Sequence, residues 1–255
     1  SGEDALPSPL FPNVDGVKFL RHGLGCGETR DISHELCGLL AGYACHPNVA
    51  GITVLSLGCQ HAQVSILEEE IAKRSPEFDK PLLVYEQQKH PSERDMLEKA
   101  IRQTFAGLER ANESVRRPAP LSKLTLGMEC GASDGFSGLS ANPALGRAAD
   151  IVVALGGKVI LSEFPELCGV EQEMVNRAVT PEVGARFIEI MRNYEARVKE
   201  AGSGFHMNPS PGNVKDGLVT DAIKSAGAAR KGGTSPVVDA LDYPGYVTKP
   251  GLSLL

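Results

Sequence analysis

Three glycine-flanked cysteines follow hydrophobic runs in this 255-residue chain, and thiols in such a setting can bind a metal or act on a substrate. They are Cys26, Cys59 and Cys130, after the runs 17–20, 52–57 and 124–126. Loops at the carboxyl ends of parallel strands form the ligand crevice of an open sheet. If each run is a strand, the three thiols should meet in such a crevice, which predicts a metal or substrate site.

Two histidines stand beside the first two cysteines, so His22 with Cys26, and Cys59 with His61, are candidate ligand pairs. Imidazole and thiolate together suit zinc or ferrous iron. Neighbouring side chains along a strand point in different directions, so we expect one member of each pair to reach the crevice. The alternative is that each cysteine is a small buried hydrophobic residue. The other three cysteines lie in or near expected helices and are predicted to be structural: Cys37, Cys45 and Cys168.

The densest polar loop runs from 129 to 143 and combines two carboxylates, several hydroxyls and an expected helix start. Free backbone amides at such a start would bind the carboxylate of a substrate. Asn142 suits the N-cap of this helix, and an elaborate turn with a cap is the structural alternative. Glu163 ends a later expected strand, and Lys231 in a glycine-rich turn could bind an anion or act as a base.

Composition excludes several functional classes. The net charge of -6 provides no basic field for nucleic acid or an anionic membrane, and no apolar run is long enough to span a membrane. The motifs GxxxxGK[ST], GxGxxG and GxSxG are absent, which argues against the common nucleotide and serine-hydrolase sites. Six cysteines without tight spacing fit a reducing compartment, so we expect a cytoplasmic protein.

The order of expected elements predicts an α/β fold of two lobes with mostly parallel sheets flanked by helices. Strand–helix alternation stops at the sequence Arg-Arg-Pro-Ala-Pro (116–120) and then restarts, so the lobes are 1–117 and 121–255. The expected strands are 17–20, 52–57, 82–85, 123–127, 158–161 and a last segment at 251–255. The expected helices begin near Asp31 or Ser33, Ser65, Ser92, Asn142 and Thr180.

Within the expected helix from Ser92, five apolar residues recur at helical spacing and predict a stripe that packs into the core: Met96, Leu97, Ile101, Phe105 and Leu108. The segment 208–213 is too rich in turn formers for the interior of an element. The chain shows no strand ahead of Phe11 and stops within an apolar segment, so we expect a piece of a longer protein.

Several of these motifs, in this order, resemble the altronate/galactarate dehydratase family. The resemblance covers nearly the whole chain and rests on HGLGCG (22–27), HPNVAG (46–51), LGC (57–59), ECGASDGFSGLSANPALG (129–146), NPSPGN (208–213) and KGGT (231–234). Many members of the family carry Glu in place of Gln60 and Gln in place of Glu129. The long central motif is the most specific of the set.

The resemblance implies a metal-dependent, usually iron-dependent, hydro-lyase that acts on sugar acids. It implies that 1–117 is the family's middle domain without its first strand, and that 121–255 is the carboxy-terminal domain without its final segment. We expect Fe²⁺, with Mn²⁺ as the alternative, and a homo-oligomer is left open. The expected site has metal ligands His22, Cys26, Cys59 and Cys130, substrate-binding Asp134, Ser137 and Asn142, and Glu163 and Lys231 as acid or base.

The chemistry expected of such a site is β-elimination, in which a proton leaves the carbon next to a carboxylate and the β-hydroxyl departs as water. Altronate is the expected substrate, and dehydration of galactarate or sulfolactate is the alternative within the class. A module that binds sugar acids without turning them over is an alternative of another class. A thiol-redox protein is a third alternative, which no CxxC motif supports.

Overall fold

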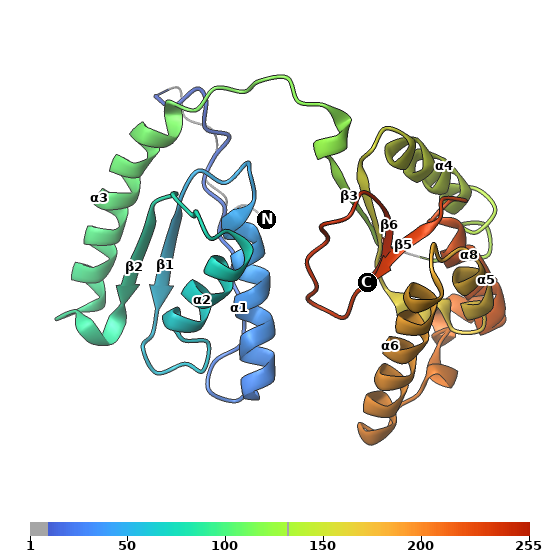
Figure 1. The fold of residues 1–255 in the computed structure, drawn as a ribbon. Coiled ribbons are helices and arrows are strands. Elements are labelled where there is room, and N and C mark those ends of the chain that lie inside the picture. The colour runs from blue at the N-terminus through green and yellow to red at the C-terminus, as the bar shows by residue number, and fades with distance from the viewer. Residues whose placement is uncertain (1–9, 132) are drawn as a thin grey trace. The chain divides into compact units, whose positions relative to one another are not determined.

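The computed structural model describes residues 10–131 and 133–255. The chain divides into two compact units, Ser1–Pro118 and Ala119–Leu255, and each has its own parallel sheet with flanking helices (Figure 1). This confirms the predicted α/β class. No helix within the described ranges is both long and apolar enough to span a membrane.

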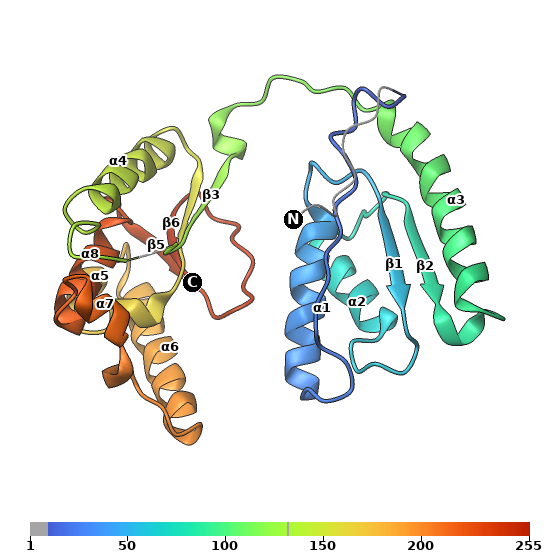
Figure 2. The same cartoon turned by 180° about the vertical axis from the view of Figure 1, so that it is seen from behind.

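The first unit is built around a two-stranded parallel sheet. Its strands are β1 (Ile52–Ser56) and β2 (Leu82–Glu86), and its helices are α1 (Arg30–Cys45), α2 (Val64–Arg74), α3 (Glu93–Asn112) and the short η1 (Gln87–Lys89). Helices α1 and α2 cover one face of the sheet and α3 covers the other (Figure 2). A two-stranded sheet is marginal in water, so packing of helices on both faces must stabilise this one.

Helix α1 begins earlier than the sequence suggested. Its N-cap is Thr29, whose hydroxyl accepts a hydrogen bond from the Ile32 amide, and the prediction of Asp31 or Ser33 was wrong. Ser33 is instead buried and donates to the Thr29 carbonyl. The expected end of the helix at His46, ahead of a proline, is confirmed.

The hydrophobic run at 17–20 does not form a strand. Val17 makes an isolated bridge, and Phe19 and Leu20 are each more than half exposed. Apolar composition predicts a strand only where a neighbouring strand is available to pair with the backbone. The first of the three cysteines therefore follows an irregular segment.

The apolar stripe expected on α3 is only partly a core stripe. Met96 and Ala100 are buried, whereas Ile101 is 67% and Phe105 is 50% exposed. The helix turns Ala100 rather than Ile101 toward β2, and Phe105 packs edge-on against Phe11, with ring centroids 5.3 Å apart. Helical spacing thus identified the helix but not the full width of its buried face.

The second unit is built around a four-stranded, fully parallel sheet in the order β3-β4-β6-β5. The strands are β3 (Thr125–Met128), β4 (Lys158–Leu161), β5 (Val237–Ala240) and β6 (Gly251–Leu254). Strand β6 lies between β4 and β5 and all four of its residues are buried. The last apolar segment of the sequence is therefore an interior strand of this sheet.

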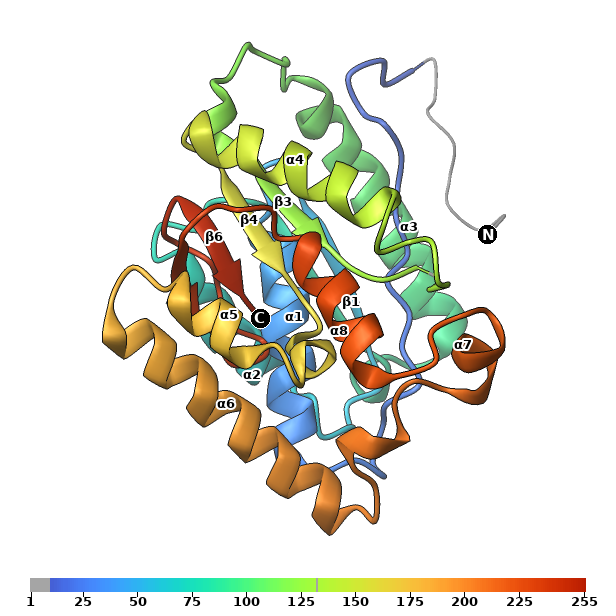
Figure 3. The same ribbon diagram turned by 90° about the vertical axis from the view of Figure 1, so that its right-hand side faces the viewer.

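The larger helices of this unit lie on one side of its sheet (Figure 3). They are α4 (Ala141–Ala154), α5 (Glu171–Asn176), α6 (Pro181–Glu200) and α8 (Asp221–Arg230). The unit also contains the short helices α7 (Pro211–Lys215), η2 (Leu121–Lys123), η3 (Phe164–Leu167) and η4 (Phe205–Met207). The core between helices and sheet includes Val159, Leu161, Phe187, Leu252 and Leu254. Thr180 caps α6 ahead of a proline, as predicted.

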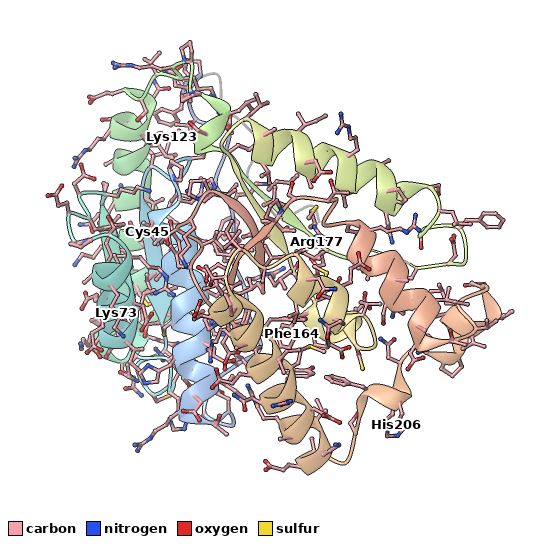
Figure 4. The ribbon with its side chains drawn as sticks, turned by 45° about the vertical axis from the view of Figure 1, so that its right-hand side comes forward. Cys45, Lys73, Lys123, Phe164, Arg177 and His206 are labelled. Atoms are coloured by element: carbon pink, nitrogen blue, oxygen red, sulfur yellow. The ribbon has the colours of Figure 1, made fainter. Side chains whose placement is uncertain are left out.

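The stretch that follows β4 joins this core to the site described below. Phe164, labelled in Figure 4, is buried and packs edge-on against Tyr194 at a centroid distance of 5.5 Å. Tyr194 in turn stacks on Phe205 at 6.0 Å. Burial of an aromatic side chain contributes about 1.5–3 kcal/mol, so this contact fixes η3 firmly at the end of β4. The segment 208–213, which was expected not to form the interior of an element, contains Ser210, the N-cap of α7, and the first residues of that short helix, so it forms the start of an element.

Candidate functional site

Glu163 lies directly after β4 and is held in an unusual backbone conformation. Its φ is 66°, and it is the only residue other than glycine with a positive φ in the described ranges. Its carboxylate accepts a hydrogen bond from the Cys130 amide (Oε2–N 2.7 Å) and pairs with Lys231 (Oε2–Nζ 3.4 Å). The left-handed turn is costly for a glutamate, and it is accompanied here by contacts to two other elements.

Lys231 follows α8 and is only 4% exposed. A buried ammonium is costly unless it is paired, and Glu163 provides the opposite charge. The Lys231 side chain has three donors, and among the described residues it makes this one ion pair, at the long distance of 3.4 Å. Lys231 is therefore the less constrained partner of the pair.

The turn that carries Lys231 is held by two charged side chains from other elements. The Asp150 carboxylate of α4 accepts hydrogen bonds from the backbone amides and the hydroxyls of Thr234 and Ser235. Arg177, labelled in Figure 4, donates to the carbonyls of Gly232 and Ser235. Burial alone would raise the pKa of Asp150, but these hydrogen bonds outweigh it and hold the pKa below its ordinary value.

Cys130 lies at the end of β3, next to Glu163 and Glu166. Ligand atoms of these three side chains lie within 4.8 Å of one another, and in the described ranges they form the one group of acidic, thiol or imidazole side chains that could share a cation. The Cys130 sulfur is 2.7 Å from the Ser133 hydroxyl. Glu166 pairs with Lys224 (Oε1–Nζ 2.8 Å), so each carboxylate of the group has an ammonium partner.

A cavity of about 480 Å³ opens beside this group. Its charged and polar lining includes Cys130, Ser137, Asn142, Glu166, Lys224, Arg230 and Lys231, and its apolar lining includes Leu139, Leu145, Leu218 and Ile223. The volume suits a small molecule. The lining carries three cationic side chains and two carboxylates, Glu129 and Glu166, and Arg230 is the cation that makes no ion pair among the described residues.

The three residues expected to bind substrate make contacts within the second unit, and their role toward a substrate stays a prediction. Asp134 accepts from the amides of Phe136 and Ser137 (both 2.8 Å), which closes the loop on itself. The Asn142 amide donates to the Gly227 carbonyl at 3.0 Å and so joins α4 to α8. Ser137 and Asn142 line the cavity. The N-cap of α4 is Ser140, so the prediction that Asn142 caps this helix was wrong.

The other expected metal ligands belong to the first unit. The Cys26 sulfur donates to the Cys59 carbonyl at 3.3 Å, and both cysteines are exposed. Partial desolvation, the neighbouring Cys59 and the negative charge of Glu28 raise the pKa of the Cys26 thiol. His22 is exposed and takes no part in a three-residue ligand group of the described ranges. Cys26 and Cys59 belong to the first unit and Cys130 to the second. That the three thiols share one site therefore stays a prediction.

Sequence reasoning missed Glu166, Lys224, Asp150 and Arg177. The spacing of three residues between Glu163 and Glu166 is a weak signal, because it brings two carboxylates together only if a turn such as η3 follows the strand. Asp150 and Arg177 reach the turn after α8 from 84 and 55 residues away, so no local pattern reveals them. Residue 132 of the central motif lies outside the described residues.

The fold and site define a two-unit α/β protein with a thiol, two carboxylates and two lysines beside a small cavity. The chain belongs to the D-galactarate/altronate dehydratase family. The carboxy-terminal domain of D-galactarate/altronate dehydratase matches residues 121–255, and the second domain of D-galactarate dehydratase/altronate hydrolase matches residues 3–112.

Three curated relatives illustrate this similarity. An altronate dehydratase of Bacillus subtilis (strain 168) is 34% identical over 241 residues, 94% of this chain and 47% of that protein. A galactarate dehydratase (L-threo-forming) of Escherichia coli (strain K12) is 34% identical over 210 residues, 81% of this chain and 40% of that protein. The beta subunit of a (2R)-sulfolactate sulfo-lyase of Chromohalobacter salexigens is 29% identical over 255 residues, 98% of this chain and 63% of that protein. The chain thus spans about half the length, or less, of the two dehydratases.

Proposed function

We propose that the whole protein is a hydro-lyase that removes water from a sugar acid, altronate first, to give a 2-keto-3-deoxy acid. The observation that carries this proposal is the arrangement of Cys130, Glu163 and Lys231 beside the cavity, in a chain that belongs to the family over both units. Two of the three relatives described above are named as dehydratases of sugar acids.

Elimination of water needs a base for the α-proton and an acid for the departing hydroxyl. Glu163 and Lys231 form an ion pair beside the cavity, and this pair would provide a carboxylate to accept the proton and an ammonium to donate one. We assign Glu163 as the base and Lys231 as the acid. Because Lys231 is buried, its proton is delivered in a poorly solvated site, where electrostatic effects are strong.

The donor set of the site fits a divalent metal. One thiol and two carboxylates, from Cys130, Glu163 and Glu166, have ligand atoms within 4.8 Å of one another, and thiolate with carboxylate is compatible with Fe²⁺ or Mn²⁺. Cys130 and Glu166 would hold the metal, and Glu163 beside them would stay available as the base. When bound, it would act as a Lewis acid that stabilises the negative charge formed as the α-proton leaves. The roles of His22, Cys26 and Cys59 as further metal ligands stay predictions.

The remaining cavity residues orient the substrate. Arg230 lies on the wall as a cation for the substrate carboxylate. Asp134 and Ser137 keep the loop before α4 closed, and Asn142 ties this loop to α8. The three residues thus shape the substrate pocket rather than contact the reacting atoms.

The test uses the complete protein, purified without oxygen and supplied with Fe²⁺, on a panel of altronate and galactarate. We expect 2-keto-3-deoxy acid from altronate, and its loss in Cys130→Ala and Lys231→Met. Lys199→Met is the matched control, because Lys199 makes an exposed pair with Glu195 on α6, far in sequence from these residues. Full activity after chelation of the metal, or in Lys231→Met, would contradict the proposal.

A second candidate function, removal of a sulfur-containing group, follows from the relative that is named as a sulfo-lyase. The similarity to that relative covers 98% of this chain. In that reaction class a sulfur-containing group leaves in place of water, although the same acid–base pair could serve. The second candidate substrate is therefore sulfolactate, with loss of sulfite rather than of water. Adding sulfolactate to the panel and measuring sulfite separates the two candidates.

A further inference from the structure

Lys224 on α8 joins three separate segments of the second unit through one ammonium group. Its Nζ lies 2.8 Å from Glu166 Oε1, 2.8 Å from Asn208 Oδ1 and 3.3 Å from Asn213 Oδ1. An ammonium has three donors, so these acceptors use all of them. The side chain is only 10% exposed, which makes the loss of any partner costly.

The same ammonium is linked to the Cys130 thiol through two further residues. Asn213, whose Oδ1 faces Lys224, donates through Nδ2 to the Ser133 carbonyl at 3.2 Å. The Ser133 hydroxyl lies 2.7 Å from the Cys130 sulfur. Lys224 therefore contacts one member of the candidate metal group directly, through Glu166, and is connected to a second, Cys130, through Asn213.

The two lysines of the site differ in how much of their hydrogen-bonding capacity is used. Lys231 has one ion pair, at 3.4 Å, whereas Lys224 has three short or moderate contacts to side-chain oxygens. A lysine that donates to a substrate needs a free donor, and Lys224 has none left. Its contacts suit a group that orients metal ligands, as the hydrogen-bond partners of ligands do in metal sites generally.

We infer that Lys224 is a positioning residue, which fixes the Glu166 carboxylate and, through Asn213 and Ser133, the Cys130 thiol for binding a divalent metal. The inference rests on the proposed function. Lys224 lies on the cavity wall, but its three donors are directed to side-chain oxygens of the protein, so it acts on the metal site through these contacts. It sets the geometry of the two ligands Cys130 and Glu166, and its loss weakens metal binding without removing a ligand.

The experiment titrates the purified chain with Co²⁺, a spectroscopic substitute for Fe²⁺, and follows the charge-transfer absorption between thiolate and cobalt. Cys130→Ala should remove the part of this absorption that Cys130 provides. Lys224→Met keeps the length of the side chain but removes its donors, and we expect Co²⁺ binding to weaken about 10- to 100-fold with an altered absorption band. Lys199→Met, the same change in an exposed pair, should leave both unchanged.

A merely structural role for Lys224 would lower the melting temperature of Lys224→Met but leave the Co²⁺ affinity and the band of the folded protein unchanged. That result would overturn the inference while the metal site stands. If no absorption of the unaltered chain depends on Cys130, both the metal site and the role of Lys224 fail. If Lys224→Met does not fold, Asn213→Ala decides: it keeps the ammonium and Glu166, and an unchanged band and affinity would overturn the inference.

Discussion

At the scale of single residues, Glu163 shows most clearly how local strain and site geometry are connected. A left-handed conformation costs a residue other than glycine about 1–2 kcal/mol. The same turn directs the carboxylate to the Cys130 amide and to Lys231. A glycine here would relax the backbone but could not make either contact.

Comparison of Glu163→Ala with Glu163→Gly separates the strain from the lost contacts. Both variants remove the carboxylate and leave Lys231 without its ion pair, so both should be less stable than the unaltered protein. Alanine keeps the strained φ and glycine does not, so we expect Glu163→Gly to be more stable than Glu163→Ala by about 1 kcal/mol. Urea unfolding measures the difference, and an alanine variant of equal or higher stability would show that the backbone is unstrained.

Sequence reasoning found some site residues for a clear physical reason and missed others. Cys130 and Glu163 both follow strands of one parallel sheet, and the carboxyl ends of such strands share an edge, so their proximity follows from topology. Lys231 was noticed through its glycine-rich turn. Lys224 looked like any polar residue of an amphipathic helix, because its three partners lie 11 to 58 residues away in sequence.

At the scale of elements, α4 and the turn after α8 approach so closely that only glycine fits at their contact. A Cβ at Gly146 would lie 2.1 Å from the Arg230 carbonyl oxygen and 2.9 Å from the Gly233 nitrogen, both backbone atoms. This contact places Lys231, the next residue after Arg230, against the sheet. The glycine is thus required by packing rather than by backbone conformation.

Gly146→Ala should therefore destabilise the protein by about 3 kcal/mol, because the two backbones must separate to admit a methyl group. Gly107→Ala is the matched control, since Gly107 lies within α3 and a Cβ there meets nothing within 4 Å. That control should raise stability by up to about 1 kcal/mol through helix propensity. Thermal unfolding should show Gly146→Ala to be less stable and Gly107→Ala to be more stable than the unaltered protein. Equal changes in stability would contradict the close contact.

Asp150 should make the contact between α4 and this turn sensitive to acid. Its pKa is held below the ordinary value in the folded state, so its stabilising contribution is present above about pH 4 and is lost as the pH falls through the lowered pKa. Asp150→Asn should cost about 2 kcal/mol at pH 7 and progressively less as the pH falls below 4. Unfolding free energies of both proteins across this range provide the test. A difference that does not change with pH would show that the charge of Asp150 is unimportant.

The elements themselves were predicted well where pattern and packing agree, and poorly where packing depends on distant partners. Helix α6 begins at the expected cap, and β4 has the expected bounds. The run at 17–20 failed because strand formation requires a neighbour that sequence composition does not reveal. Helix α3 has the expected start, but which side chains it buries depends on how β2 meets it.

At the scale of the whole molecule, the two compact units are connected by an irregular segment around Arg116 and Pro118. Arg116 is exposed and lies in neither a helix nor a strand, so limited trypsin digestion should cut there first. The bond after Arg117 precedes proline and should resist. Mass spectrometry should find fragments 1–116 and 117–255, and a first cut within α6 would contradict two independently stable units.

The interior position of β6 has a consequence for the order of events during synthesis. Strands β4 and β5 are made first, but neither pairs with the other, and both pair with residues 251–254. On the ribosome, the first unit can close while the second waits, with the apolar edges of β4 and β5 uncovered, until this strand has left the exit tunnel. We expect nascent chains stalled before residue 251 to engage chaperones and to resist protease only up to about residue 118.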